Sequence, residues 1–190
     1  MTSGYRCDFR LRRAVDRLRR GGVIAYPTEA VYGLGADPDN ANALRRVLAL
    51  KQRPAHKGLI LIGASLAALK PYLAELTEAE EARMAASWPG PVTWLAPAAT
   101  RAPPLVTGGS ERIAVRVPGH DLARAVCAAW GGAVVSTSAN RAGMRPLRSG
   151  VAVRLAFGDR IDDVITAPVG NAERPTTIRD LRSGEIVRCG

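Results

Sequence analysis

Apolar side chains in the first part of the sequence recur at the spacing of one helix face. Within residues 8–20 they are Leu11, Ala14, Val15 and Leu18. Asp8 precedes the pattern as a candidate N-cap, and Gly21-Gly22 follows it as a C-terminal stop. The pattern predicts an amphipathic helix, and its arginines at 12, 13, 17, 19 and 20 are typical of a solvated face.

After this helix, short runs rich in β-branched residues alternate with segments of helical character. The predicted strands cover residues 23–26, 58–62, 92–96, 113–117 and 134–137, and a last pair lies within 176–188 around a turn at 182–184. The predicted helices cover residues 40–51, 121–130 and 151–157, and two more begin after Ser65 and Thr77. Glu80 completes a capping box with Thr77. Residues 28–38 and 97–111 are predicted loops.

This alternation predicts an α/β fold with a mixed parallel and antiparallel sheet and flanking helices. No repeat or linker divides the 190 residues, so we expect a single domain over 4–190. A content of 47% hydrophobic and 23% charged residues excludes disordered, collagenous and membrane classes. No apolar run approaches the roughly 20 residues of a spanning helix, and the N-terminus does not resemble a signal peptide. We therefore expect a cytoplasmic protein without a membrane partner.

Metal and triad chemistry are poorly supported by the composition. The three cysteines, Cys7, Cys127 and Cys189, lie far apart in the sequence and suggest neither a disulfide framework nor a paired-cysteine metal site. His56 and His120 are the only histidines, which disfavours zinc-ligand spacing and a nucleophile with a histidine base. Three free thiols fit a reducing compartment.

The formal net charge of +10 indicates anionic partners such as phosphates or nucleic acid. Nearly all of the positive charge is arginine, because lysine occurs only at positions 51, 57 and 70. A general compositional bias toward arginine explains many surface arginines equally well.

The sequence has neither a Walker loop nor a GxGxxG fingerprint, so a nucleotide site would be built from loops at strand ends. In KQRPAHKG, Lys51, Arg53 and Lys57 fall within seven residues. Pro54 stops the preceding helix there, and an apolar strand follows. Such a cluster suits nucleotide phosphates. The alternative is a solvated helix end whose basic residues complement the helix dipole.

Two polar segments follow predicted strands. In PTEAVYGLG, Thr28 and Glu29 come directly after a strand, and Tyr32 stands near two glycines that let the backbone turn or approach a ligand. In VSTSAN, Ser136, Ser138 and Asn140 alternate and can line one face of a pocket. Both segments suit a small polar ligand. Alternatively, the first is a plain turn with its tyrosine in the core, and the second only caps the next element.

The segment RIAVRVPGH places two arginines on one face of a strand. Arg112 and Arg116 are four residues apart, so both side chains point to the same side of the sheet. Two guanidiniums on one face need an anion. His120, which follows Pro-Gly, is more typical of a loop or capping histidine than of a catalytic one.

In combination these segments resemble a known family. PTEAVYGLG, KQRPAHKGLIL, WPGPVTW, AVRVPGH and VSTSAN occur in the order found in YrdC-type threonylcarbamoyl-AMP synthases of the short bacterial form, and the ending PTTIRDLRSGEIVR also fits. The resemblance covers essentially the whole chain. It implies a twisted, YrdC-like mixed sheet around a large basic concave surface.

The resemblance also implies a nucleotidyltransferase reaction. L-Threonine, bicarbonate and ATP would give threonylcarbamoyl-adenylate and pyrophosphate, and the product would serve the threonylcarbamoyladenosine modification of tRNA, bound directly or through partner proteins. Mg²⁺ would enter with ATP, and neither a prosthetic group nor a protein metal site is expected. The attacking carbamate oxygen is already anionic, so few histidines are needed.

Roles in the family carry over to matching positions of this sequence. The expected catalytic residues are Lys51, Arg53 and Lys57. The expected ATP-binding residues are Arg53, Lys57, Arg112, Ser138, Asn140 and Arg188. The expected threonine-binding residues are Thr28, Arg116, Ser136 and Thr176. The sequence departs from the family's long form at Ala30, where that form contacts threonine, and at Ile62, where it has a polar residue. We therefore expect a different arrangement of the threonine pocket, and these departures leave open which loop hydroxyl binds threonine.

The main alternative is a non-catalytic module that binds double-stranded RNA or tRNA in RNA maturation, which the net charge of +10 also supports. It predicts salt-sensitive RNA binding without ATP turnover, although the sequence has no RNP-like aromatic motif. A carbamoyl-transfer relative of the hydrogenase-maturation type would need regions that 190 residues cannot hold.

Overall fold

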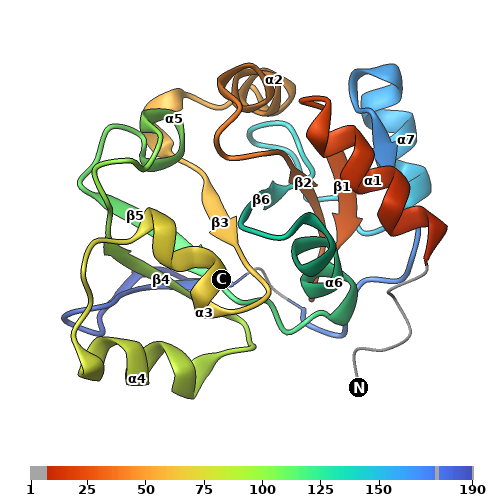
Figure 1. Ribbon diagram of the computed structural model, residues 1–190. Helices are drawn as coiled ribbons and strands as arrows, with labels where there is room; N and C mark the ends of the chain where they lie inside the picture. The colour runs from red at the N-terminus through yellow and green to blue at the C-terminus, as the bar shows by residue number, and fades with distance from the viewer. Residues whose placement is uncertain (1–7, 174–175, 190) are drawn as a thin grey trace.

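A single mixed sheet organises the computed structural model, which describes residues 8–173 and 176–189 (Figure 1). The strands of these residues are β1 Ile24–Pro27, β2 Tyr32–Gly35, β3 Ile60–Ile62, β4 Val92–Pro97, β5 Arg112–Arg116, β6 Val134–Ser138, β7 Asp163–Val164, β8 Thr177–Asp180 and β9 Ile186–Arg188. Their order is β7-β1-β2-β6-β3-β5-β4-β8-β9. The pairs β1–β7, β3–β5 and β4–β8 are parallel and the other neighbours antiparallel, which confirms the predicted fold class. Residues 4–7 of the predicted domain, including Cys7, lie outside the described residues.

Several of the helices begin at capping side chains that the sequence places there. In the described part of the chain the α-helices are α1 Phe9–Arg19, α2 Ala41–Lys51, α3 Leu66–Leu69, α4 Glu78–Ser87, α5 Pro104–Thr107, α6 Asp121–Trp130 and α7 Gly150–Phe157. Asp8 caps α1 by accepting the N–H of Arg10 at 2.9 Å. The capping box of Thr77 and Glu80 is present at α4. Helix α6 begins at Asp121, as predicted, and His120 is its N-cap residue.

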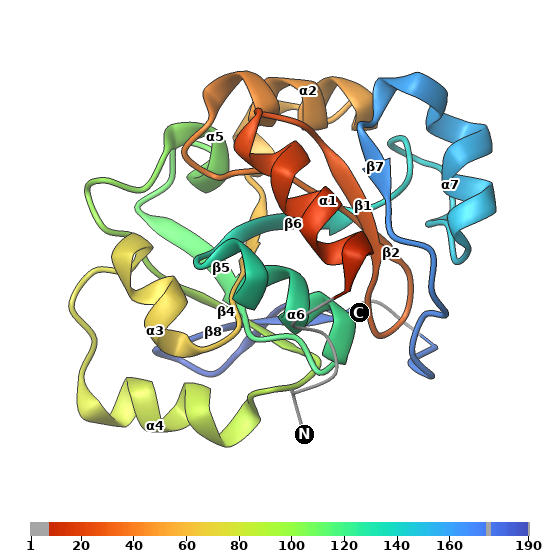
Figure 2. The ribbon, with the colours of Figure 1, turned by 45° about the vertical axis from the view of Figure 1, so that its right-hand side comes forward.

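Helices cover both faces of the sheet because its inner strands are apolar on both sides. On one face, α1 and α6 lie side by side over Ile24, Tyr26 and Ile62 (Figure 2). Ala25 and Leu61, the neighbours of these residues along β1 and β3, point to the other face, where they pack in the core that includes α2. Successive strand residues therefore serve opposite layers.

The predicted loop after β1 contains strand β2, so this part of the sequence prediction was wrong. Residues 32–35 pair with β1 as an antiparallel hairpin in which Tyr26 lies opposite Gly33. Glycines usually weaken a strand, which is why the segment was predicted as a loop. Here they make room for the Tyr26 ring, because a Cβ on Gly35 would lie 2.6 Å from Tyr26 Cε1. The predicted loop 97–111 likewise contains the short helix α5.

The prediction of a reducing, cytoplasmic location was based on free thiols and on the lack of a membrane span. Cys127 and Cys189 are both free. Burial raises the pKa of the Cys127 thiol to about 12, which keeps it protonated and unreactive at neutral pH. Over residues 8–173 and 176–189, no helix combines the length and the apolar character needed to cross a membrane. The cytoplasmic location stays a prediction.

Candidate active site

A cavity of about 210 Å³ brings distant parts of the chain together. Strands β2, β3, β4, β5, β6, β8 and β9 line it, together with the loops at 28–31 and 57–59. The predicted site residues that line it are Thr28, Arg53, Lys57, Arg112, Arg116, Ser136, Ser138, Thr176 and Arg188. Lys51 and Asn140 lie beside the cavity, where both contact Ser138.

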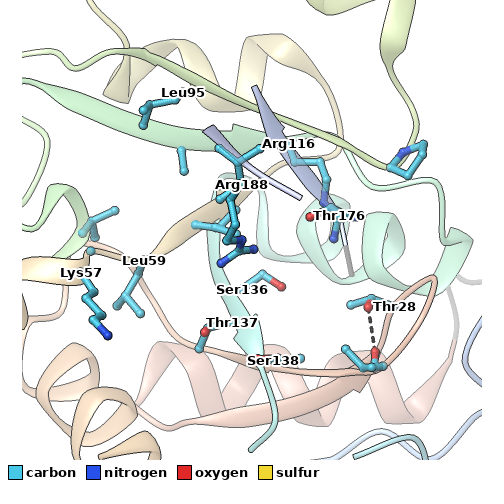
Figure 3. A pocket seen from close by; sticks show the side chains of 18 of the residues that line it. Thr28, Lys57, Leu59, Leu95, Arg116, Ser136, Thr137, Ser138, Thr176 and Arg188 are labelled. Atoms are coloured by element: carbon cyan, nitrogen blue, oxygen red, sulfur yellow. Dashed lines mark hydrogen bonds between the residues drawn. The ribbon is translucent and has the colours of Figure 1, made fainter. Parts of the chain in front are cut away.

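The cavity has a strongly basic lining with two distinct ends. Among the described residues that line it, Glu29 is the one carboxylate, against the cations Arg53, Lys57, Arg112, Arg116 and Arg188. Figure 3 shows Arg188 in the middle, Lys57 to one side of it, and Arg116 with Thr176 to the other. An excess of fixed positive charge in a concave site attracts a polyanion.

The loop after α2 presents two of these cations. Arg53 donates from Nε to the Gly58 carbonyl at 3.0 Å and from Nη2 to the Lys57 carbonyl at 2.8 Å. These bonds fold the loop back on Arg53 and leave the exposed Lys57 side chain at the cavity (Figure 3). Gly58 has a φ of +56°, and a Cβ there would lie 2.7 Å from the Val106 carbonyl oxygen, so the loop can pass close to α5 only with glycine at this position.

Arg53 and Arg188 are close enough to repel each other. Burial lowers the pKa of the Arg53 guanidinium, and the charge of Arg188 lowers it further. Burial also lowers the pKa of Arg188, which comes from β9 at the other end of the chain. Both shifts reflect a cost of holding charge in this site, and a bound anion would offset that cost.

Lys51 is buried beside the cavity and faces protein oxygens. Its side chain is almost completely shielded, since the residue is only 4% exposed. Nζ donates to the Ser138 carbonyl and, at 3.1 Å each, to the carbonyl and Oδ1 of Asn140. Burial lowers the pKa of Lys51 to about 8, and the nearby charge of Arg53 adds to this effect. The ammonium thus joins the end of α2 to the end of β6, and a catalytic role for Lys51 stays a prediction.

The two arginines of β5 line the same cavity, as strand alternation predicts, and each has a carboxylate partner. Arg112 pairs with Asp180 of β8 at the rim, where the Arg112 side chain is 44% exposed. Arg116 donates from Nη1 to Glu29 Oε1 at 2.9 Å, and both of these side chains are mostly buried. The Gly119 N–H also donates to the same carboxylate oxygen, at 2.6 Å. Arg116 is therefore held in a fixed position.

Hydroxyl groups gather at the Arg116 end. Thr28 Oγ1 donates to the Val31 carbonyl at 2.7 Å, and Thr176 Oγ1 lies 3.0 Å from Thr93 Oγ1. Ser136 is buried on β6. Neutral hydroxyls next to a buried guanidinium suit a small polar ligand that carries a carboxylate.

The two departures from the family's long form lie in different places. Ala30 lines the cavity, so the missing polar group there leaves an apolar patch in the wall. Ile62 is fully buried in the core under α6 and is not part of the lining. Glu29 is not among the site residues predicted from the sequence, although its place next to Thr28 after an apolar strand is a usable signal.

Metal ligands and histidines do not shape this site. In the described ranges, no group of three or more His, Cys, Asp or Glu side chains is placed to hold a metal ion. His120 lies outside the cavity, with Nε2 3.2 Å from the Pro168 carbonyl oxygen. Among the described residues that line the cavity, charge comes from arginine, lysine and one glutamate.

Comparison with known proteins gives a consistent result. Residues 16–190 match the Sua5/YciO/YrdC family model, which is described as "Telomere recombination". A threonylcarbamoyl-AMP synthase of Halorhodospira halophila is 56% identical over 95% of this chain and 94% of its own length. Sua5 of P. abyssi, solved in complex with L-threonine, superposes with a TM-score of 0.85 and 33% identity over 90% of this chain, which spans only about half (51%) of that longer protein. E. coli YciO gives a TM-score of 0.82 and 27% identity over 94% of this chain and 87% of its own. The chain belongs to the Sua5/YciO/YrdC family.

Proposed function

We propose that this enzyme is a threonylcarbamoyl-AMP synthase of the nucleotidyltransferase class, which joins L-threonine, bicarbonate and ATP into threonylcarbamoyl-adenylate and releases pyrophosphate. The observation that carries the proposal is the strongly basic cavity, in which Lys57 lies on one side of Arg188 and the buried Arg116 lies with Thr176 on the other. The 56% identity to the threonylcarbamoyl-AMP synthase of Halorhodospira halophila supports it. These findings favour an enzyme over the non-catalytic RNA-binding alternative.

The cations would hold the triphosphate and stabilise the transition state. Carbamate oxygen attacks the α-phosphate, and negative charge develops on the phosphate oxygens as pyrophosphate leaves. Arg53, Lys57 and Arg188 line the cavity where this charge would form. Because the nucleophile is already anionic, positioning and charge stabilisation can supply the catalysis of this step. Mg²⁺ enters with ATP as part of the substrate, and no prosthetic group takes part.

Three further residues complete the proposed ATP site. Arg112 binds from the rim of β5, while Ser138 and Asn140 bind from the end of β6. Lys51 acts through them, because its ammonium fixes both residues. Lys51 is then a positioning residue whose protonation controls the shape of the ATP site.

The Arg116 end would hold threonine. Arg116 binds the carboxylate, and the hydroxyls of Thr28, Ser136 and Thr176 surround the rest of the amino acid. The adenylate product then passes to the tRNA threonylcarbamoyl-transfer machinery, either through partner proteins or on tRNA bound directly.

Purified protein given ATP, bicarbonate and threonine is expected to release pyrophosphate, because the carbamate displaces it from the α-phosphate. A coupled pyrophosphate assay measures the rate, and mass spectrometry identifies the adenylate. Matched samples lack threonine or bicarbonate, or contain serine in place of threonine. Folded protein that binds ATP and RNA yet releases no pyrophosphate would contradict the synthase and favour the RNA-binding module.

The affinity for ATP is expected to fall about tenfold between pH 7 and pH 9, because Lys51, whose pKa is lowered by burial to about 8, loses its proton in this range. The neutral amine has two N–H donors in place of three and can no longer hold all of its acceptors on Ser138 and Asn140. Isothermal titration calorimetry with ATP across this range measures the change.

Global unfolding does not explain such a fall in affinity. The folded pKa of Lys51 lies below its ordinary value of 10.5, so between these values the unfolded chain binds more protons and Lys51 makes the free energy of unfolding rise with pH. Lys51→Met should bind ATP weakly with little pH dependence, while Lys70→Met, at an exposed lysine paired with Glu81, follows the wild type. An unchanged pH dependence in Lys51→Met would assign the titration to another group.

A further inference from the structure

Two buried polar atoms at the Arg116 end of the cavity have no hydrogen-bond partner. They are Oε2 of Glu29 and Nε of Arg116, and the side chains that carry them are 15% and 6% exposed. Unpaired buried donors and acceptors are costly and rare in folded proteins. Both residues line the cavity, so a ligand in this end of it can supply the missing partners.

The two unpaired atoms have opposite chemistry. Oε2 of Glu29 accepts hydrogen bonds and carries negative charge, whereas Nε of Arg116 donates and carries positive charge. The bond between Arg116 Nη1 and Glu29 Oε1, 2.9 Å long, keeps the two groups adjacent. A free α-amino acid carries an ammonium and a carboxylate on the same carbon, which matches this adjacent pair of opposite charges. Among the described residues of the cavity, Glu29 is also the one carboxylate that an ammonium could meet.

We propose that Glu29 is a catalytic residue of the synthase that binds the threonine ammonium through Oε2 and removes the proton that blocks its attack on bicarbonate. This inference rests on the proposed function. It assigns the general base to the carbamate-forming step, which precedes adenylation and differs from it in needing proton transfer.

The proposed step balances in atoms and charge. The threonine ammonium gives one proton to Glu29 Oε2, and the freed nitrogen lone pair forms the N–C bond to the bicarbonate carbon. The C–O bond to the bicarbonate hydroxyl breaks, and the hydroxyl leaves as water with a second proton from the nitrogen. Threonine carbamate, water and a protonated Glu29 result, and Glu29 then returns its proton to solvent.

Backbone contacts hold Glu29 in place for this role. The Gly170 N–H donates to the Thr28 carbonyl at 3.0 Å, and the Ala172 N–H donates to the Glu29 carbonyl at 3.1 Å. Gly170 packs so closely that a Cβ there would lie 2.8 Å from the Glu29 carbonyl oxygen. With Oε1 fixed by Arg116 and Gly119, Oε2 is the oxygen left for substrate. A fixed acceptor is what general-base catalysis requires.

A neighbouring cavity offers the proton an exit. Glu29 also lines a second cavity of about 580 Å³, together with Gly119 and His120. Glu29 is therefore part of the wall of both cavities, and the second cavity gives its proton a route to solvent.

The test separates carbamate formation from adenylation with Glu29→Gln. Glutamine keeps an oxygen that can accept from Arg116 and Gly119 but cannot take a proton, so synthesis of threonylcarbamoyl-adenylate is expected to fall at least about 100-fold. The reverse half-reaction, in which purified threonylcarbamoyl-adenylate and pyrophosphate give ATP and threonine carbamate, does not involve this proton and is expected to stay within about threefold of wild type. Luminescent detection of ATP measures the reverse rate.

The controls make each outcome decisive. Glu75→Gln removes an exposed carboxylate outside the cavity and should match wild type in both directions. Wild-type protein that catalyses neither reaction would refute the proposed function itself. Undiminished synthesis by Glu29→Gln, or equal losses in both directions, would overturn the role of Glu29 alone. If circular dichroism shows that Glu29→Gln does not fold, Glu29→Asp replaces it. This variant is expected to lose about tenfold in synthesis and nothing in the reverse half-reaction. Equal losses in both directions would overturn the proposal for this variant too.

Discussion

Arg116→Ala is expected to raise the KM for threonine about 100-fold or more while the KM for ATP stays within about threefold. Arg116 is only 5% exposed, and it lies in the cavity wall. A charge-assisted hydrogen bond to a carboxylate is strong in such a shielded place. Its removal also leaves Glu29 without a counterion, and that carboxylate would then repel the carboxylate of threonine. Initial rates with each substrate varied in turn measure both constants.

Arg112→Ala is the matched control on the same strand. Arg112 pairs with Asp180 at the rim and belongs to the proposed ATP site, so its loss should raise the KM for ATP and leave that for threonine nearly unchanged. Circular dichroism and thermal unfolding accompany both variants, because Arg116 belongs to a buried pair. A folded Arg116→Ala protein with a defect confined to ATP would contradict this division of roles.

Arg53→Ala and Lys57→Ala are each expected to lower kcat/KM for adenylate synthesis at least about tenfold. Each substitution removes a cation from the side of the cavity where we place the triphosphate. Arg53 also holds two loop carbonyls, so its loss should lower the melting temperature as well. Lys57→Ala should lower the activity without lowering the melting temperature, because the Lys57 side chain is exposed.

Another lysine of the chain provides a control for the Arg53→Ala and Lys57→Ala variants. The chain has three lysines: Lys51 is buried against protein oxygens, Lys57 lines the cavity, and Lys70 is exposed and paired with Glu81. Lys70→Ala removes the same charge as Lys57→Ala from a surface away from the cavity, and should retain wild-type activity. Full activity in both Arg53→Ala and Lys57→Ala would refute the proposed phosphate site.

Local signals in the sequence were sufficient for most helices. The apolar spacing around Leu11 and Leu18 and the cap at Asp8 are properties of neighbouring residues, so α1 could be predicted without knowledge of the fold. The capping box of Thr77 and Glu80 is local in the same way. Strand alternation also placed Arg112 and Arg116 on one side of the sheet, which the structure confirms.

Features that depend on residues far away in the chain could not be predicted from the sequence. Strand β2 was missed because Gly33 and Gly35 look like loop residues until the Tyr26 ring packs over them. The burial of Lys51 depends on residues near position 140, whose approach no local pattern reveals. Glu29 was passed over because its importance comes from Arg116 and Gly119, about 90 residues further along the chain.

The order in which the cavity's walls are synthesised has a consequence in the cell. Thr28 and Arg188 line the same cavity, and β8 pairs with β4 more than 80 residues earlier in the chain. A growing chain on the ribosome therefore cannot complete this site until almost all of its residues have emerged, and long-range strand pairing of this kind forms slowly. A nascent or truncated chain that ends before residue 176 lacks Thr176 and Arg188, and so cannot engage substrates in the way proposed for the folded enzyme.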